Sequence, residues 1–231
     1  MRIGSIIDIS LVDVPGIPVS VIFTGGCNFN CPYCQNADLI SLDSGTEVSI
    51  SEIIERVSGH FVDGYCITGG EPTLQKELPE LLKDLRNSSD GHINLNTQGS
   101  VPDVLRQCVP YLDSVWFDIK TSPSKYLTIS RTKDNPWKRV ENSIKYLLKS
   151  SVSFWPRTTY VGKLMTPNDI LSIADKLASL GYSGKYTVQN YIASSGVREN
   201  EKEFLSSPDR SEIDEIADLI PPQLSLNLEW R

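Results

Sequence analysis

Short apolar runs alternate with amphipathic stretches along most of this chain. Residues 18–23 form an apolar, β-branched run, whereas residues 48–57 carry apolar side chains at the three- and four-residue spacing of a helix. Residues 167–180 have the clearest limits, because Pro167 suits a first helical turn and Gly181 suits a stop. The full pattern predicts strands at 18–23, 65–68, 93–96, 114–119, 152–161, 185–189 and 224–230, and helices at 48–57, 78–85, 101–109, 137–149, 167–180 and 207–219.

Strands that alternate with helices predict a parallel sheet with right-handed crossovers. Six βα units follow one another, and six are too few for the closed barrel of eight strands. We therefore expect an α/β fold with a partial (β/α)6 TIM-like barrel of parallel strands. The apolar, β-branched first dozen residues predict a small hairpin or an edge strand. We expect a single domain over residues 1–231, with its core at about 17–192 and a C-terminal extension at about 193–231.

Composition limits the possible classes of function. The hydrophobic content of 39% is enough to bury a sizeable core, and the net charge of −7 argues against a nucleic-acid-binding surface. No apolar run approaches the roughly 20 residues that span a bilayer. The first residues also lack the apolar stretch of a signal peptide. We expect a cytoplasmic protein with no membrane association.

Polar residues gather where the predicted strands end. Active sites of α/β folds collect at the carboxyl ends of the strands, so we expect these residues to meet in space. They are the cysteine loop after 18–23, Gly69-Gly70-Glu71 after 65–68, Asn96-Thr97 after 93–96, Asp118 to Lys120 after 114–119, Arg157 within 152–161, and Gln189-Asn190 after 185–189.

The most informative stretch holds Cys27, Cys31 and Cys34 in a spacing of three residues and then two. Three thiolates on one loop can hold three corners of a cubane iron–sulfur cluster, whereas most such clusters take four cysteines. One iron would then stay open, and an open metal position usually serves chemistry rather than structure. Cys66 and Cys108 stand apart in apolar surroundings, and we expect both to be buried, inert thiols.

Two other interpretations of the cysteine loop stay open. Structural zinc needs four ligands, but the two histidines, His60 and His92, are distant in sequence. A ferredoxin-like electron carrier would use four cysteines and would not need so large an α/β scaffold. A non-enzymatic module that binds zinc or a cluster is the corresponding hypothesis, and metal analysis would separate it.

The cysteine loop resembles the cluster motif of the radical S-adenosylmethionine (SAM) enzymes, Cys-x3-Cys-x-aromatic-Cys. Gly69-Gly70-Glu71-Pro72 is similar to the second motif of that superfamily. Further motifs, from about residue 10 to about residue 192, resemble the activating enzymes of glycyl-radical proteins, in particular those of anaerobic ribonucleoside-triphosphate reductase and pyruvate formate-lyase. These motifs are Leu11-Val12-Asp13-Val14-Pro15-Gly16, Phe23-Thr24-Gly25-Gly26, Asn96-Thr97-Gln98-Gly99, Phe117-Asp118-Ile119-Lys120, Arg157-Thr158-Thr159 and Gln189-Asn190.

This resemblance implies a radical SAM oxidoreductase of the glycyl-radical-activating type. Cys27, Cys31 and Cys34 would ligate a [4Fe-4S] cluster, and SAM would chelate the open iron. Reductive cleavage of SAM would give methionine and a 5′-deoxyadenosyl radical, which would take hydrogen from a glycine of a partner such as anaerobic ribonucleotide reductase. A low-potential donor, flavodoxin or ferredoxin, would supply the electron. No separate catalytic residue is expected, because the cofactors carry the chemistry.

The resemblance also implies individual roles. Gly70 and Glu71 would hold the SAM amino group, Tyr33 would pack against the adenine, and Asp118 with Lys120 would lie near the SAM carboxylate, in some family members with a monovalent cation. Plainer alternatives are a solvated turn for Glu71, a loop side chain that fills the barrel mouth for Tyr33, and a structural ion pair for Asp118 and Lys120. The full set of expected cofactor-binding residues is Tyr33, Gly69, Gly70, Glu71, Asn96, Thr97, Asp118, Lys120, Arg157 and Gln189. Arg157 would reach a carboxylate or ribose, or form an internal salt bridge.

Two positions depart from the family pattern. Gln35-Asn36 stands where a His-Asn pair is common, and Asn96 replaces the aspartate of an Asp-Thr-Asn-Gly turn. The second change removes a negative charge, so a cation there should bind more weakly. Both leave the substrate open, and the alternative hypothesis is a radical SAM enzyme that acts on a small molecule or nucleobase, similar to a deazapurine synthase.

Overall fold

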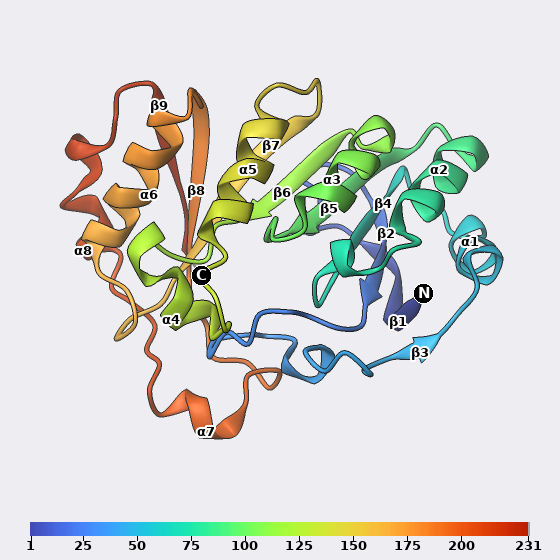
Figure 1. Cartoon of the computed structure of the whole chain (residues 1–231), viewed down its shortest axis with the longest axis horizontal. Coiled ribbons are helices and arrows are strands. Elements are labelled where there is room, and N and C mark those ends of the chain that lie inside the picture. The colour runs from blue at the N-terminus through green and yellow to red at the C-terminus, as the bar shows by residue number, and fades with distance from the viewer. Residues whose placement is uncertain (231) are drawn as a thin grey trace.

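The fold is built on one curved sheet. The computed structural model describes residues 1–230, and within them the strands form a nine-stranded sheet in the order β3-β1-β2-β4-β5-β6-β7-β8-β9 (Figure 1). The strands are β1 Arg2–Ser10, β2 Val19–Thr24, β3 Thr46–Glu47, β4 Gly64–Gly69, β5 His92–Thr97, β6 Ser114–Asp118, β7 Ser153–Tyr160, β8 Gly184–Asn190 and β9 Leu224–Glu229.

All neighbouring pairs from β2 through β9 are parallel, whereas β1 pairs with β2 and with β3 in the antiparallel sense. The two ends of the sheet, β3 and β9, do not pair with each other, so the barrel stays open. The expected partial barrel of parallel strands is therefore confirmed. The first residues do form a strand, but β1 lies between β3 and β2, so the expected edge position belongs to the two-residue β3 instead.

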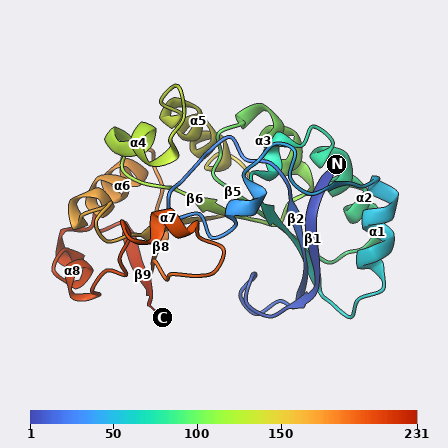
Figure 2. The same ribbon diagram turned by 90° about the horizontal axis from the view of Figure 1, so that it is seen from below.

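Helices cover the outer face of the curved sheet, and Figure 2 shows α1 to α6 arching over it. Strand side chains alternate between the two faces. Ile22, Ile67 and Leu95 point to the helices and are fully buried in the main core, whereas Thr68 and Asn96 point the other way and line a cavity. The helices are α1 Ile50–Ser58, α2 Leu78–Ser88, α3 Pro102–Cys108, α4 Tyr126–Ser130, α5 Trp137–Leu147, α6 Pro167–Ser179, α7 Glu199–Lys202 and α8 Ser211–Asp214.

None of the helices within residues 1–230 is both long and apolar enough to cross a membrane.

One predicted helix is wrong in its extent. The expected helix at 207–219 is a short α8 followed by a 3-10 turn at Ala217–Leu219. The Asp209 carboxylate accepts hydrogen bonds from the backbone and hydroxyl of Ser211, which fixes a turn before the helix can begin. Ile216, with φ of −103° and ψ of 0°, then separates α8 from the 3-10 turn.

The segment after β8 is hydrogen-bonded to the cysteine loop, and α7 lies beside that loop in Figure 1. The Arg198 guanidinium donates to the side-chain oxygen of Asn30 and to the carbonyl of Cys31, the latter at 3.2 Å. Glu201 forms ion pairs with Arg198 and Arg131. The C-terminal part of the chain therefore takes part in holding the loop that carries the three cysteines.

Helix α6 begins as the sequence predicts, and its first turn also ties it to the loop after β6. Thr166 and Asp169 form a capping box around Pro167. The buried Asp169 carboxylate also accepts from Ser122 at 2.6 Å and pairs with Lys125 at 2.7 Å. Although burial opposes the shift, these partners lower the pKa of Asp169 below its usual value.

We expect Asp169→Ala to lower the free energy of unfolding by about 2 kcal/mol, because it removes half of the capping box and takes the acceptor from the buried Ser122 hydroxyl. A lowered pKa stabilises the fold above the usual carboxyl pKa, and that contribution disappears as the pH falls through the folded value. Urea unfolding at neutral pH and in acid measures the free energy of unfolding of wild type and Asp169→Ala. The difference between the two proteins should be smaller in acid than at neutral pH. Asp175→Ala, an exposed position on the same helix, is the matched control. Equal losses for both variants would contradict this account.

Candidate cofactor site at the carboxyl ends of the strands

A cavity of about 380 Å³ opens at the carboxyl ends of the parallel strands. Every residue that the sequence singled out for a cofactor or metal lines it. These residues are Cys27, Cys31, Tyr33, Cys34, Gly69, Gly70, Glu71, Asn96, Thr97, Asp118, Lys120, Arg157 and Gln189. The parallel register of β2 and β4 to β8 brings them together from six separate stretches of sequence.

The cysteine loop leaves β2 and forms one wall of this cavity. Cys31 is buried, and Cys27 and Cys34 are half-buried. Burial raises the pKa of Cys27 to about 12 and that of Cys31 to about 11, so both thiols are neutral at ordinary pH unless a bound cation compensates the thiolate. Iron supplies that charge, so buried thiols on one loop are a donor set that suits an iron–sulfur cluster.

The arrangement does not resemble a single-ion site. Among the described residues, no three histidine, cysteine, aspartate or glutamate side chains converge closely enough to hold one metal ion. In a cubane cluster each cysteine binds a different iron, so the three sulfurs need not converge. Cys66 and Cys108 are fully buried elsewhere in the fold, which confirms the expected burial of both, and their inertness stays a prediction.

Two glycines bring the turn after β4 against the base of the cysteine loop. Gly69 has φ of +121°, and a Cβ there would lie 2.3 Å from the carbonyl oxygen of Thr24. A Cβ on Gly70 would lie 2.1 Å from the carbonyl oxygen of Gly26. These positions need glycine for backbone packing, and the approach to a ligand that the sequence suggested stays a prediction.

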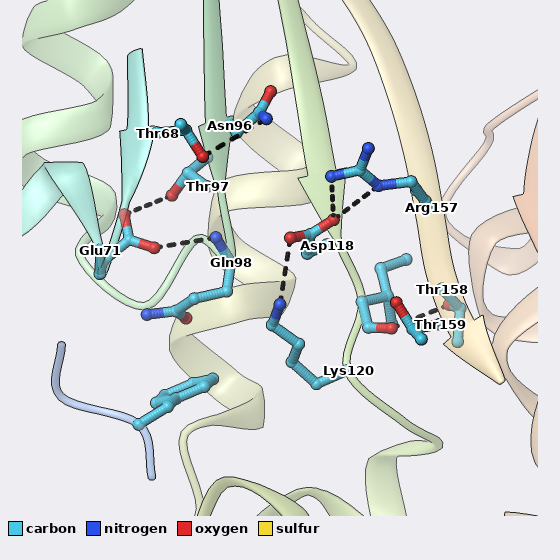
Figure 3. A network of polar contacts seen from close by, with 12 residues as sticks. Thr68, Glu71, Asn96, Thr97, Gln98, Asp118, Lys120, Arg157, Thr158 and Thr159 are labelled. Carbon is cyan, nitrogen blue, oxygen red and sulfur yellow. Dashed lines mark hydrogen bonds and ion pairs between the residues drawn. The ribbon is translucent and has the colours of Figure 1, made fainter. Parts of the chain in front are cut away.

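Glu71 is 1% exposed, so the alternative of a solvated turn residue is wrong. Its Oε1 accepts from Thr97 Oγ1 at 2.6 Å and from the N–H and hydroxyl of Thr73, and its Oε2 accepts from the Gln98 N–H at 2.9 Å (Figure 3). Burial raises the pKa of Glu71, while these four hydrogen bonds favour the ionised form. The carboxylate thus joins the ends of β4 and β5, and Oε2 keeps acceptor capacity for a ligand ammonium.

The turn after β5 presents two buried oxygens. Asn96 Oδ1 and Gln98 Oε1 have no hydrogen-bond partner within residues 1–230, although both residues line the cavity. Such buried acceptors are rare unless a ligand or water satisfies them. The sequence suggested Asn96 as a binding residue but not Gln98, which was named only as part of the motif Asn96-Thr97-Gln98-Gly99. Its place beside Thr97 at a strand end was the available signal.

A cluster of three charges occupies the centre of the site (Figure 3). Asp118 Oδ2 lies 3.0 Å from Lys120 Nζ, and Asp118 Oδ1 accepts from Arg157 Nε at 2.9 Å. Although burial opposes the shift, Arg157 and Lys120 lower the pKa of Asp118 to about 2. One carboxylate and two cations leave a net charge of +1, which suits an anionic ligand group. The ion-pair alternative is therefore present in the structure, and contact with SAM stays a prediction.

The remaining predicted residues complete the walls. Tyr33 is 5% exposed, and its hydroxyl donates to the Lys120 carbonyl at 3.0 Å. Gln189 Nε2 donates to Thr159 Oγ1 at 2.8 Å. Glu229, on β9, also lines the cavity, and sequence reasoning missed it because the C-terminal region carries no motif.

Comparisons with known proteins fit this geometry. A Methanocaldococcus jannaschii protein whose name provisionally calls it a glycyl-radical enzyme activating enzyme is 28% identical over 220 residues, which cover 93% of this chain and 89% of that protein. A 7-carboxy-7-deazaguanine synthase from Methanospirillum hungatei is 36% identical over 91 residues, or 38% of this chain and 36% of the synthase. A solved domain of the pyruvate-formate lyase-activating enzyme from Bacteroides vulgatus has a TM-score of 0.56 at 14% identity, covering 71% of this chain and 97% of that domain.

The family model described as the Radical SAM superfamily matches residues 21–177. The match spans well over half of the chain, includes the whole cysteine loop, and ends within α6. The chain therefore belongs to the radical SAM superfamily.

Proposed function

We propose that this radical SAM enzyme generates a glycyl radical on a partner polypeptide, such as an anaerobic ribonucleotide reductase. The observation that carries the proposal is the three-cysteine loop, which faces a net-positive charge cluster across a cavity of about 380 Å³. A [4Fe-4S] cluster with SAM supplies one-electron cleavage of the sulfonium and a 5′-deoxyadenosyl radical that abstracts hydrogen. The protein supplies binding, orientation and exclusion of water.

Each part of the site has a proposed task. Cys27, Cys31 and Cys34 hold three irons. Lys120 and Arg157 attract the methionine carboxylate of SAM through charge-assisted hydrogen bonds. The expected monovalent cation has weaker support, because these two cations already neutralise Asp118 and because residue 96 is an uncharged asparagine.

Other residues orient the rest of SAM. The SAM ammonium donates hydrogen bonds to Glu71 Oε2 and to the backbone of Gly69 and Gly70. The ribose forms hydrogen bonds with the side-chain amides of Asn96 and Gln189. Thr97 holds Glu71 in place at 2.6 Å.

The size of the cavity supports a polypeptide substrate. About 380 Å³ is near the lower end of the roughly 300–1,000 Å³ typical of small-molecule pockets. A cavity of this size has to hold both the cluster and SAM, so we expect the second reactant to enter from the mouth, as a narrow loop of a larger protein can. The relative that aligns with 93% of this chain carries the name of a glycyl-radical enzyme activating enzyme. We further propose that the chain acts as one cytoplasmic domain and takes its electron from flavodoxin or ferredoxin.

The second candidate is a small-molecule reaction like that of a 7-carboxy-7-deazaguanine synthase. It is supported by the 36% identity over 91 residues and by the two unpartnered amide oxygens, which suit donors on a nucleobase. A small-molecule product formed under anaerobic conditions without a protein partner would favour this candidate.

We expect Cys31→Ala to abolish formation of 5′-deoxyadenosine from SAM, because an iron loses its buried thiolate ligand. The measurement is anaerobic reconstitution with iron and sulfide, reduction with dithionite, and chromatographic detection of the product. Cys108→Ala removes another fully buried thiol that does not line the cavity, so it should retain product formation. If Cys31→Ala keeps wild-type turnover, the cysteine loop does not hold the active cluster.

The glycyl-radical step is tested by electron paramagnetic resonance. The reduced, reconstituted enzyme is mixed with SAM and with a glycyl-radical protein encoded in the same genome. We expect a glycine-centred doublet, caused by the hydrogen that stays on Cα, that collapses when both Cα hydrogens of the target glycine are replaced by deuterium. Cleavage of SAM with no such signal from any co-encoded partner would sink this proposal and leave radical SAM chemistry in place.

A further inference from the structure

Two tyrosine hydroxyls hold the backbone of Lys120, one on each side. The Lys120 N–H donates to the hydroxyl oxygen of Tyr126 at 3.1 Å, and the Tyr33 hydroxyl donates to the Lys120 carbonyl at 3.0 Å. Tyr33 belongs to the cysteine loop, whereas Tyr126 begins α4. Lys120 therefore connects the cysteine loop to α4 through hydrogen bonds between its own backbone and the two tyrosine hydroxyls.

The two tyrosines provide the backbone hydrogen-bond partners of Lys120, which lies just beyond the end of the sheet. The last backbone bond of the β6 edge to β7 is donated by the Ile119 N–H to the Arg157 carbonyl at 2.8 Å. Lys120, one residue later, has its N–H and carbonyl bonded to the two tyrosines. The position of the Lys120 backbone, from which the side chain reaches Asp118, therefore depends on these hydroxyls rather than on strand pairing.

Both tyrosine rings are buried. Tyr126 is fully buried and Tyr33 is 5% exposed. Phe29 of the cysteine loop meets the Tyr126 ring edge-on, with ring centres 6.3 Å apart, and Trp137 packs on the same ring at 5.2 Å. Aromatic packing of this kind restricts movement of the Tyr126 ring, so its hydroxyl acts as a fixed point.

We propose that Tyr33 is a positioning residue that acts through its hydroxyl on Lys120 and thereby couples the cysteine loop to the charge cluster of Lys120, Asp118 and Arg157. This inference rests on the proposed binding of the SAM carboxylate by Lys120. It differs from the adenine contact that the family resemblance implies, because a ring contact needs no hydroxyl. The hydrogen bond to the Lys120 carbonyl is the observation that favours the hydroxyl.

We expect Tyr33→Phe to weaken SAM binding roughly two- to tenfold, which corresponds to the loss of one hydrogen bond of about 0.5–1.5 kcal/mol. Iron content should stay at the wild-type level, since the ring and the cysteines are retained. Affinity is measured by calorimetry on the anaerobic, cluster-loaded protein. A second readout is the change that SAM causes in the resonance spectrum of the reduced cluster, which Tyr33→Phe should alter.

A double-mutant cycle with Lys120→Met tests whether Tyr33 acts through Lys120. If it does, adding Tyr33→Phe to Lys120→Met costs no further affinity. Additive losses would show that the two residues act independently and would overturn the inference. Wild-type affinity in Tyr33→Phe together with weak binding in Tyr33→Leu would assign the role to the ring and would also overturn it.

Tyr182→Phe is the matched control, because the Tyr182 hydroxyl also donates to a lysine carbonyl, that of Lys185 at 2.7 Å, and Tyr182 does not line the cavity. It should leave SAM affinity unchanged. Tyr126→Phe removes the other contact to Lys120 and should weaken SAM binding in the same direction as Tyr33→Phe. These measurements use no partner protein, so failure to form a glycyl radical would sink the proposed function and leave this inference standing.

Discussion

The two-residue alternation of the parallel strands is the constraint on which the rest of the structure depends. Each strand must place one row of side chains against the helices, so apolar, buried residues recur at alternate positions, as Ile67 and Leu95 do. The opposite row then has to face the inside of the open barrel. Parallel register aligns these inner rows, and it pairs Asp118 directly with Arg157 and Thr159 with Gln189. The position of the site residues thus follows from the burial of the other row of strand side chains against the helices.

The charged side chains inside this cavity stay ionised because they are paired with groups of opposite charge. A buried carboxylate without partners would lose its hydration and become protonated. Asp118 avoids this through Lys120 and Arg157, and the Arg157 guanidinium also lies 4.9 Å from the centre of the Trp116 ring. Because all three groups are already fixed by one another, an incoming anion meets oriented donors and little reorganisation is needed.

Much of the fold and the membership of the site could be predicted from the sequence, since strand alternation, the cysteine spacing and the strand-end motifs are local signals. The sequence could not predict which neighbours these residues would bond. Glu71 is identifiable as a motif residue, yet its contacts to Thr97 and Gln98 come from another strand. The hydrogen bond from Arg198 to the cysteine loop joins residues more than 160 positions apart in the sequence, and Arg198 belongs to no recognisable motif. The helix expected at 207–219 failed for a related reason, because the competing turn at Asp209 is made by one side chain.

The long-range bonds that the sequence could not reveal have one feature in common: several of them end on the cysteine loop. Lys120 reaches it through Tyr33, the turn after β5 through the bond from Gln98 to Asn28, and the C-terminal segment through Arg198. The backbone of the cysteine loop offers few internal hydrogen bonds to hold its shape. The anchors from the rest of the fold do not involve the metal, so they lower the entropy cost of ordering the ligands on binding. Because of these contacts, a displacement of Lys120, Gln98 or Arg198 would also displace the cysteine loop.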